Sequence, residues 1–279
     1  MIDGTARGYY SVFPSVTCSY LLDLRRRSTP SFTTFTFAVI GALQIILGGS
    51  STSCVALAML VFGVLLIQCR NIRRFLNGYA TLSISITGFI FFVVLRLHEH
   101  FSFVVTELLH KSLSLSERTP MWDLALNALL RDRPIIGFGA TGYDQLVVNN
   151  VQYYGTHNMC LEVFFIGGIL GAACFFLLLF SCARALYSER NNLCVAFISV
   201  VLGSYCIIGC MESIFEPSFY FLLLFGIFIS FKISNQRKAN ESFASTRQPK
   251  SRLRSDELSG RQTKTRHLPT DRRFIQRIS

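Results

Sequence analysis

Long apolar runs, separated by shorter polar segments, make up most of the chain. Six of them approach the roughly 20 apolar residues that a helix needs to cross the hydrocarbon core of a bilayer. The six predicted spans are residues 32–47, 52–69, 79–97, 159–182, 193–210 and 214–231. A seventh run, residues 9–22, is short and contains polar residues and a proline, so it is a marginal span. The pattern predicts an all-α, polytopic membrane helical bundle.

The spans divide the chain into five parts. An N-terminal segment, residues 1–31, carries the marginal span. Two groups of three spans, residues 32–97 and 159–231, enclose a long polar connection, residues 98–158, and a tail covers residues 232–279. Connections of this length usually have a function of their own. We therefore expect the chemistry of the protein in residues 98–158.

The composition and the distribution of charge agree with a membrane location. Hydrophobic residues make up 51% of the chain and charged residues 15%, whereas soluble domains carry about a quarter charged residues. The arginines at 25–27 follow the weak apolar run instead of preceding it, which argues against a cleavable secretory signal.

Basic residues in the short loops predict the orientation, because they stay on the cytoplasmic side. Arginines gather at residues 25–27, 70–74 and 184–190, and the short alternate connections, near residues 48–51 and between the fifth and sixth spans, contain none. Both ends of the six-span bundle are then cytoplasmic, and the long connection, residues 98–158, faces outward.

Most of the net charge of +11 comes from the tail, where thirteen Lys and Arg residues stand against four acids. The tail has little apolar material, so we expect a disordered cytoplasmic segment that touches anionic lipid headgroups. It lacks interleaved aromatic residues, and we expect no nucleic-acid partner.

The nine cysteines lie almost entirely in the predicted spans and show no repeated metal-ligand spacing. Cys206 and Cys210 are one helical turn apart, a spacing that could hold a ligand pair. A pair without further partners is more often apolar packing. The sequence predicts no metal site.

The outer connection contains a short amphipathic helix. Thr119 can cap a helix whose first turn holds Pro120, residues 121–131 continue it, and Pro134 ends it. Its polar residues recur every fourth position and form a narrow stripe: Asp123, Asn127 and Arg131. We expect this helix at the membrane surface or against the bundle, with the stripe toward water.

Gly137 and Gly139 fit the first letters of a G-x-G-x-x-G pattern. That fingerprint has meaning only between a strand and a helix of a βαβ unit, and here a surface helix precedes it. We predict a tight bend with close backbone approach instead of a dinucleotide site.

His157 and Asn158 precede the fourth predicted span, where Asn158 can cap the helix and the helix end favours an anion. His157 is either a titratable group or a polar anchor at the interface. Arg118 is either functional or a solvent-facing charge. Glu162 lies in the first turns of the span, where an acid needs a partner or a cavity to offset its burial.

The order of these residues resembles the O-antigen ligase and polysaccharide polymerase family of multi-pass bacterial membrane glycosyltransferases. The likeness covers Ser-x-Arg-x3-Trp, a proline that ends a helix, a Gly-x-Gly bend, and His-Asn-x2-Leu-Glu before a glycine-containing span. The residues that carry it are Ser116, Arg118, Trp122, Pro134, Gly137, Gly139, His157, Asn158, Leu161, Glu162, Gly168 and Gly171.

The resemblance implies a fold, a reaction and a place. Such proteins have a fold similar to the GT-C glycosyltransferases and lie in the bacterial plasma (inner) membrane. They transfer glycans from undecaprenyl diphosphate on the outer face of this membrane, without a metal or other cofactor. The expected partners are membrane lipids and other polysaccharide-assembly proteins. Ligases pass a finished glycan to a lipid core, whereas polymerases join repeat units.

The resemblance also suggests a role for each residue. Arg118 would bind the departing diphosphate in a bidentate fork, and His157 would act as the base on the incoming hydroxyl. The expected substrate-binding residues are Trp122, Gly137, Gly139, Asn158, Glu162 and Arg7.

The chain also departs from the family. Members usually have about ten or more spans, so the front of this chain looks shortened, and Arg7 is a doubtful counterpart of an earlier outer-loop arginine. Residues 48–51 lack the arginine that the family often shows there. Our leading hypothesis is a polymerase-like enzyme; the alternatives are a ligase, a polysaccharide or lipid transporter, and an inactive fragment of the family.

Overall fold

The computed structural model describes residues 8–26, 31–47, 51–96, 114–139, 142–148, 151–212 and 217–247. These residues are mostly helical, as predicted, and two short antiparallel strands pair Val147 with Gln152 and Val148 with Val151. The elements are α1 (Gly8–Arg26), α2 (Phe32–Leu47), α3 (Ser51–Leu66), α4 (Arg70–Arg73), α5 (Gly78–Phe89), the π-helix η1 (Ile90–Val94), α8 (Ser114–Asp132), the 3₁₀ turn η2 (Gly142–Gln145), β1 (Val147–Val148), β2 (Val151–Gln152), α9 (Met159–Ser188), α10 (Leu193–Gly209) and α11 (Pro217–Arg247).

A helix occupies each of the six predicted spans. Two, α9 and the Pro217–Phe243 part of α11, are long and apolar enough to cross a membrane. Four shorter apolar helices, Phe32–Leu47, Ser53–Leu66, Gly78–Val94 and Leu193–Gly209, correspond to the other predicted spans. The structure thus supports an all-α membrane protein, and the six crossings and their orientation stay predictions.

The outer surface of the bundle is apolar. Phe62 on α3, Leu177 on α9 and Phe221 on α11 expose more than half of their surface, and similar side chains cover α2. Exposed apolar area on this scale marks contact with lipid or another protein. The marginal span also forms a helix, α1, which packs against α2 and α10.

Helix α10 forms the centre of the bundle, and almost all of its side chains are buried. In lipid, helices associate through close packing and hydrogen bonds because the hydrophobic effect does not favour protein over lipid contact. Both features occur here. Thr81 on α5 donates its hydroxyl to the Ser199 carbonyl of α10 over 3.0 Å, and a Cβ on Gly78 would lie 2.4 Å from the Ala183 carbonyl of α9.

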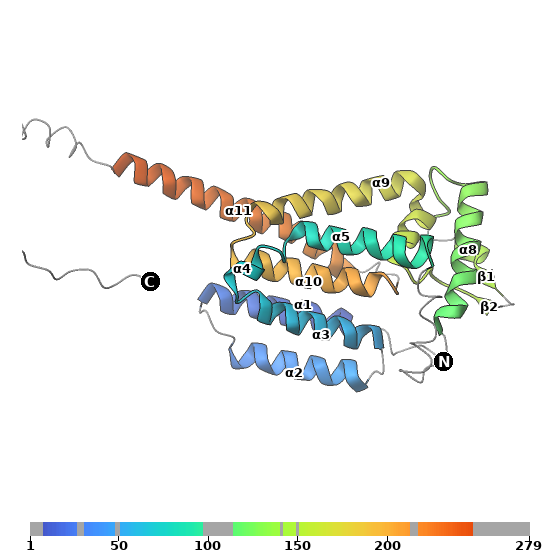
Figure 1. Cartoon of the computed structure of the whole chain (residues 1–279), viewed down its shortest axis with the longest axis horizontal. Coiled ribbons are helices and arrows are strands. Elements are labelled where there is room, and N and C mark those ends of the chain that lie inside the picture. Colours follow the sequence, from blue (N-terminus) through green and yellow to red (C-terminus); the bar gives the residue numbers. More distant parts are fainter. Residues whose placement is uncertain are drawn as a thin grey trace, which may run out of the picture. The chain divides into compact units, whose positions relative to one another are not determined.

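The helix connections gather at two opposite ends. At one end, Arg73 donates to the carbonyls of Ile67 over 2.7 Å and Asn191 over 3.2 Å, so two of the basic connections lie together. The opposite end carries β1, β2 and α8, which lies across the ends of the other helices instead of alongside them (Figure 1). The orientation of these two ends relative to a membrane stays a prediction.

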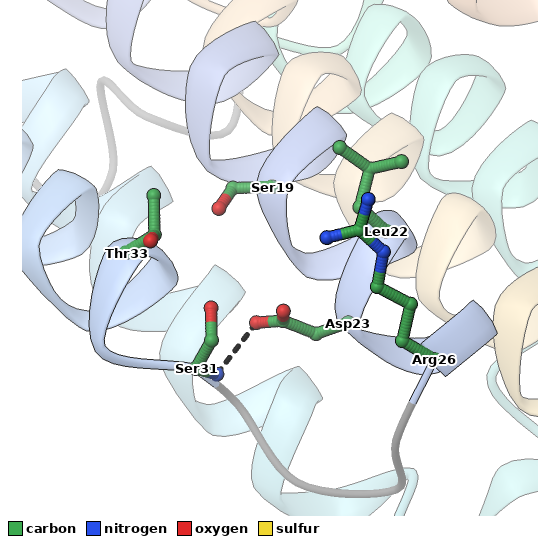
Figure 2. Close-up of a pocket in the computed structure, with 6 residues that line it drawn as sticks. All are labelled: Ser19, Leu22, Asp23, Arg26, Ser31 and Thr33. Atoms are coloured by element: carbon green, nitrogen blue, oxygen red, sulfur yellow. Dashed lines mark hydrogen bonds between the residues drawn. The ribbon is translucent and has the colours of Figure 1, made fainter.

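A cavity of about 270 Å³ lies where α1 is followed by α2 (Figure 2). Its lining residues are Ser19, Leu22, Asp23, Arg26, Ser31 and Thr33. The Asp23 carboxylate accepts from the Ser31 amide and the Thr34 hydroxyl, each over 2.6 Å, and so stabilises the N-terminus of α2. The polar groups of this cavity therefore have a local structural role.

Helix α9 is broken at Gly168, which has φ +59° and ψ −159°. The segment 134–139, which follows α8, replaces the helical hydrogen bonds lost at the break. Two amides beyond the break donate to this segment and two carbonyls before it accept from the segment, in four bonds: Ile169 to Pro134 (2.9 Å), Leu170 to Ile135 (3.1 Å), Phe138 to Phe165 (2.9 Å) and Gly139 to Ile166 (2.9 Å). We call this backbone pairing the α9 splice.

The splice confirms the predicted glycine bend with close backbone approach. Gly137 and Gly139 have φ of +67° and +72°. A Cβ on Gly137 would lie 2.5 Å from the Gly168 amide nitrogen, and a Cβ on Gly168 would lie 2.4 Å from the Ile135 carbonyl. Two glycines, one from each segment, therefore let the two backbones meet.

Helix α8 begins earlier than predicted. It starts at Ser114 and includes Pro120, so the predicted start at Thr119 and Pro120 was wrong, whereas its end before Pro134 was correct. Pro120 is the seventh residue of α8 and has no amide hydrogen, so the carbonyl four residues before it lacks its helical partner. The packing of the apolar face of α8 on the bundle offsets this loss.

Residues 1–233 and 234–279 are two separate units. The described part of the second unit, up to Arg247, is helical and continues α11, so the disorder predicted from residue 232 onward was wrong for this stretch. Extending an existing helix avoids the nucleation free energy, and the pair Arg237–Glu241, at 3.9 Å, has the favourable spacing of four residues. Residues 248–279 lie outside the described part of the chain.

The splice makes a prediction about three neighbouring sites. Gly168→Ala and Gly137→Ala should each lower the free energy of unfolding by at least ~1–2 kcal/mol, the strain of a left-handed backbone, with the backbone clash in addition. Thermal unfolding of the purified protein in detergent measures this. Gly167→Ala is the matched control, because a Cβ there meets no atom within 4 Å. Equal unfolding temperatures for Gly167→Ala and Gly168→Ala would contradict the splice.

Candidate functional site

Helix α8 is seated on the end of the bundle by its apolar face. Met121, Trp122, Ala125 and Leu129 are buried, in or beside a second core cluster that includes Val93, Leu146, Leu161 and Phe165. The predicted polar stripe is partly confirmed, since Asn127 and Arg131 are exposed and Asp123 is half-buried. Asp123 pairs with Arg96, which follows η1. This seating fixes where the side chains of α8 meet the rest of the molecule.

Arg118 lies one helical turn before Trp122, at the edge of the buried face. Its guanidinium donates to the Met211 carbonyl and forms an ion pair with Glu212, with 3.1 Å between Nη2 and Oε1. About a fifth of the side chain is exposed. The guanidinium therefore lies at the end of α10, in contact with both protein and solvent.

His157 lies on the other side of the same carboxylate. Its Nδ1 is 3.1 Å from Oε2 of Glu212, and 39% of the side chain is exposed. Its φ of +50° is unusual for a residue other than glycine, and such strain gathers at functional sites. One carboxylate thus joins the arginine and the histidine that the sequence singled out.

The hydrogen bond from His157 and the ion pair with Arg118 keep Glu212 ionised. Burial opposes its charge, but the hydrogen bond from His157 and the charge of Arg118 outweigh burial and hold the pKa of Glu212 below its usual value. An ionised carboxylate only accepts hydrogen bonds. Nδ1 of His157 therefore carries a proton, and Nε2 is the ring nitrogen available as a base.

A buried network holds the backbone before His157. The Trp122 indole donates to the Thr156 carbonyl over 2.7 Å, and the Thr156 hydroxyl donates to Glu162 over 2.6 Å. Glu162 also accepts from the Thr156 amide and the Tyr143 hydroxyl. Burial, the hydrogen bond to Glu162 and the charge of Glu162 raise the pKa of Tyr143, so Tyr143 remains a donor. The network joins α8, η2 and α9 around His157.

Asn158 performs the predicted capping and more. Its Oδ1 accepts from the Leu161 amide over 3.0 Å, and its Nδ2 donates to the Cys210 carbonyl over 3.0 Å. The first bond stabilises the start of α9. The second holds the end of α10, and therefore Glu212, next to His157.

The structure separates the predicted site residues into groups. Arg118 and His157 meet at Glu212, while Trp122, Asn158 and Glu162 are buried beside them. Gly137 and Gly139 belong to the α9 splice, and Arg7 lies outside the described residues. Substrate contact by any of these residues stays a prediction.

Sequence reasoning missed the site role of Glu212. The signal available was an acid directly after an almost wholly apolar span, in a turn predicted to face outward. Pairing it with Arg118 and His157 required knowledge that α8, α9 and α10 meet.

Within the described residues, no group of three or more His, Cys, Asp or Glu side chains could hold a metal ion. Cys206 and Cys210 are both buried, and Sγ of Cys210 lies 3.2 Å from the Cys206 carbonyl. A Cβ on Gly88 would lie 2.1 Å from Sγ of Cys210, so this thiol packs directly against α5.

The fold and the site define a helical membrane protein whose polar side chains converge at one end of the bundle. A model of the O-antigen ligase family matches residues 36–176, half of the chain, from α2 into α9. The chain belongs to the O-antigen ligase family, whose members are membrane-integral and of the ligase or polymerase glycosyltransferase type. Comparison with curated proteins and with solved structures gives no match. The matched residues include Arg118 and His157 but not Glu212.

The lowered pKa of Glu212 makes a prediction about stability. A carboxylate whose pKa is lower in the folded than in the unfolded protein stabilises the folded protein at pH values above its unfolded pKa of about 4.3. This stabilisation is lost as the pH falls through the lower folded pKa. Wild type should therefore unfold a few degrees above Glu212→Gln at pH 7, and the difference should begin to shrink below about pH 4.3 and disappear once the pH is below the folded pKa. Thermal unfolding across this range measures it; a constant difference would contradict the ion pairs.

Proposed function

We propose that this protein transfers a glycan from undecaprenyl diphosphate to an acceptor hydroxyl at the outer face of a bacterial plasma membrane. The observation that carries the proposal is the meeting of Arg118 and His157 on one carboxylate at the end of the bundle opposite the basic connections. Family membership supplies the reaction type. The contact of Arg118 and His157 with one carboxylate supports the proposal that a cation and a base act on the same substrate.

Arg118 would stabilise the departing diphosphate. When the glycosidic bond breaks, the diphosphate leaves with the electron pair, and its charge spreads over several oxygens. A guanidinium matches these oxygens with paired N–H donors. This charge stabilisation requires no bound cofactor.

His157 would act on the incoming sugar. Its Nε2 takes the proton of the acceptor hydroxyl as the oxygen attacks the anomeric carbon, and the imidazolium then releases this proton to water. A positioned base of this kind contributes roughly 10²–10⁴ in rate. Holding a lipid-linked donor and its acceptor together supplies a larger share through proximity.

The end of α8 away from Arg118 suits contact with a lipid-linked donor. Leu130, Ile135 and Ile136 expose about two thirds of their surface near the end of α8, next to exposed Arg131 and Arg133. Apolar side chains flanked by arginines are typical of the membrane interface. A polyprenol chain in the bilayer would place its diphosphate at this level.

The break in α9 does not favour transport. Transporters use broken helices because the free ends of the half-helices bind substrate. At Gly168, four backbone hydrogen bonds with residues 134–139 occupy the groups near the break.

We favour polymerisation over ligation, as the sequence suggested. A polymerase transfers the glycan to another repeat unit and a ligase transfers it to a lipid core, so the acceptor distinguishes the two.

The catalytic assignment predicts the effect of removing either side chain. Arg118→Ala and His157→Ala should each lower transfer at least ~10²-fold, because charge stabilisation or the base is lost. Arg118→Lys should not restore full activity, since an ammonium lacks the planar fork. The measurement is product formation by the full-length protein in lipid vesicles with an undecaprenyl-diphosphate-linked oligosaccharide.

Arg184→Ala is the control, because Arg184 is exposed on α9 near the end of the bundle that carries the basic connections. A product ladder from donor alone indicates polymerase, and a single addition to a lipid core indicates ligase. Wild-type activity in both Arg118→Ala and His157→Ala would refute the proposed function.

A further inference from the structure

Glu212 links two groups whose proposed roles in the reaction are different. Its Oε1 pairs with Arg118 at 3.1 Å and its Oε2 with Nδ1 of His157 at 3.1 Å, and 18% of the side chain is exposed. Among the described residues, these are the charged and titratable groups that face it from α8 and from the segment before α9. Glu162 and Tyr143 are joined to each other through the buried network around Thr156.

The backbone that carries Glu212 is held from three directions. The Glu212 amide donates to the Ile208 carbonyl over 2.8 Å, which continues the last turn of α10. Asn158 donates to the Cys210 carbonyl from α9, and Arg118 donates to the Met211 carbonyl from α8. Exposed ion pairs contribute little because both side chains move freely. Here the carboxylate and both partners are fixed, so the contact is a built feature of the site.

The carboxylate acts differently on its two partners. Toward His157 it fixes the tautomer with the proton on Nδ1 and stabilises the imidazolium that forms during proton transfer, as the acid does in Ser-His-Asp sites. Toward Arg118 it competes with an incoming anion, because it occupies an N–H group that could bind phosphate oxygen.

We propose that Glu212 is a positioning residue that orients His157 as a base and occupies Arg118 until a diphosphate displaces it. This inference rests on the proposed function. In this exchange the diphosphate takes the place of the carboxylate on the guanidinium, and Glu212 keeps its negative charge and its contact with His157. The charge left on Glu212 then favours transfer of the hydroxyl proton to Nε2.

Glu212→Gln tests both parts, because glutamine has nearly the same shape and no charge. Transfer should fall at least ~10-fold in kcat, whereas KM for the lipid-linked donor should fall, since Arg118 no longer has an ionic competitor. The acidic limb of the pH–rate profile should move to lower pH, because the imidazolium loses its counter-ion. Glu212→Asp keeps the charge and should keep the acidic limb of wild type.

Binding provides a second readout that does not depend on turnover. Trp122 is the single tryptophan of the chain, and it bonds to the residue before His157, so its fluorescence reports on the site. Titrated with inorganic diphosphate in vesicles of neutral lipid, Glu212→Gln should bind roughly tenfold more tightly than wild type, the effect of removing one charged competitor. Arg118→Ala should bind more weakly. Asp132→Asn, which removes an exposed acid from the end of α8, should match wild type.

The outcomes separate the two proposals. If Arg118→Ala and His157→Ala keep full transfer, the proposed function fails. If those variants are inactive but Glu212→Gln has the pH profile and diphosphate affinity of wild type, the role of Glu212 fails. If Glu212→Gln shifts the acidic limb of the pH–rate profile but binds diphosphate as wild type does, Glu212 does not compete with the substrate at Arg118. If Glu212→Gln binds diphosphate more tightly but leaves the acidic limb unshifted, Glu212 does not orient His157.

Discussion

A helix that breaks in a lipid environment must satisfy the backbone groups that the break releases, because no water is available to do so. Helix α9 breaks at Gly168, and residues 134–139 supply the missing donors and acceptors. The rest of this end of the bundle depends on this exchange. It ties the chain after α8 to α9, so that α8 lies across the bundle and the residue before His157 can bond to Trp122. Without the pairing, several backbone groups would lack a hydrogen-bond partner, and each would destabilise the fold by several kcal/mol. This cost is far larger than the stabilisation that any single side-chain contact in the site provides.

The polar residues at this end then divide into two kinds. Trp122, Thr156 and Glu162 are buried and bonded to one another, so they stabilise the backbone and hold the strained conformation of His157. Arg118 and His157 remain partly exposed and share Glu212. A fully buried ion pair would be hard to open for a substrate, whereas a wholly exposed one would have no fixed geometry. The site lies between these limits, as a site that exchanges one anion for another requires.

Several features were predictable from residues near one another in sequence. The apolar runs located the helices, the glycines at 137 and 139 indicated a bend, and Asn158 before an apolar run indicated a helix cap; the structure confirms each. The errors also have local causes. Proline is favoured in the first turn of a helix, so Pro120 by itself predicts a helix start. Composition does not register the extension of an existing helix, so the tail after residue 231 by itself predicts disorder.

The sequence by itself determined the helical class, the polar outer segment and the candidates Arg118 and His157, because periodicity, capping and charge act over a few residues. It could not determine that Glu212 joins these two, or that Gly137 meets Gly168. Those contacts link segments far apart in the chain, and they arise only when α8, α9 and α10 pack together and every buried polar group finds a partner. The tertiary structure therefore decided which polar residues form the site and which support it.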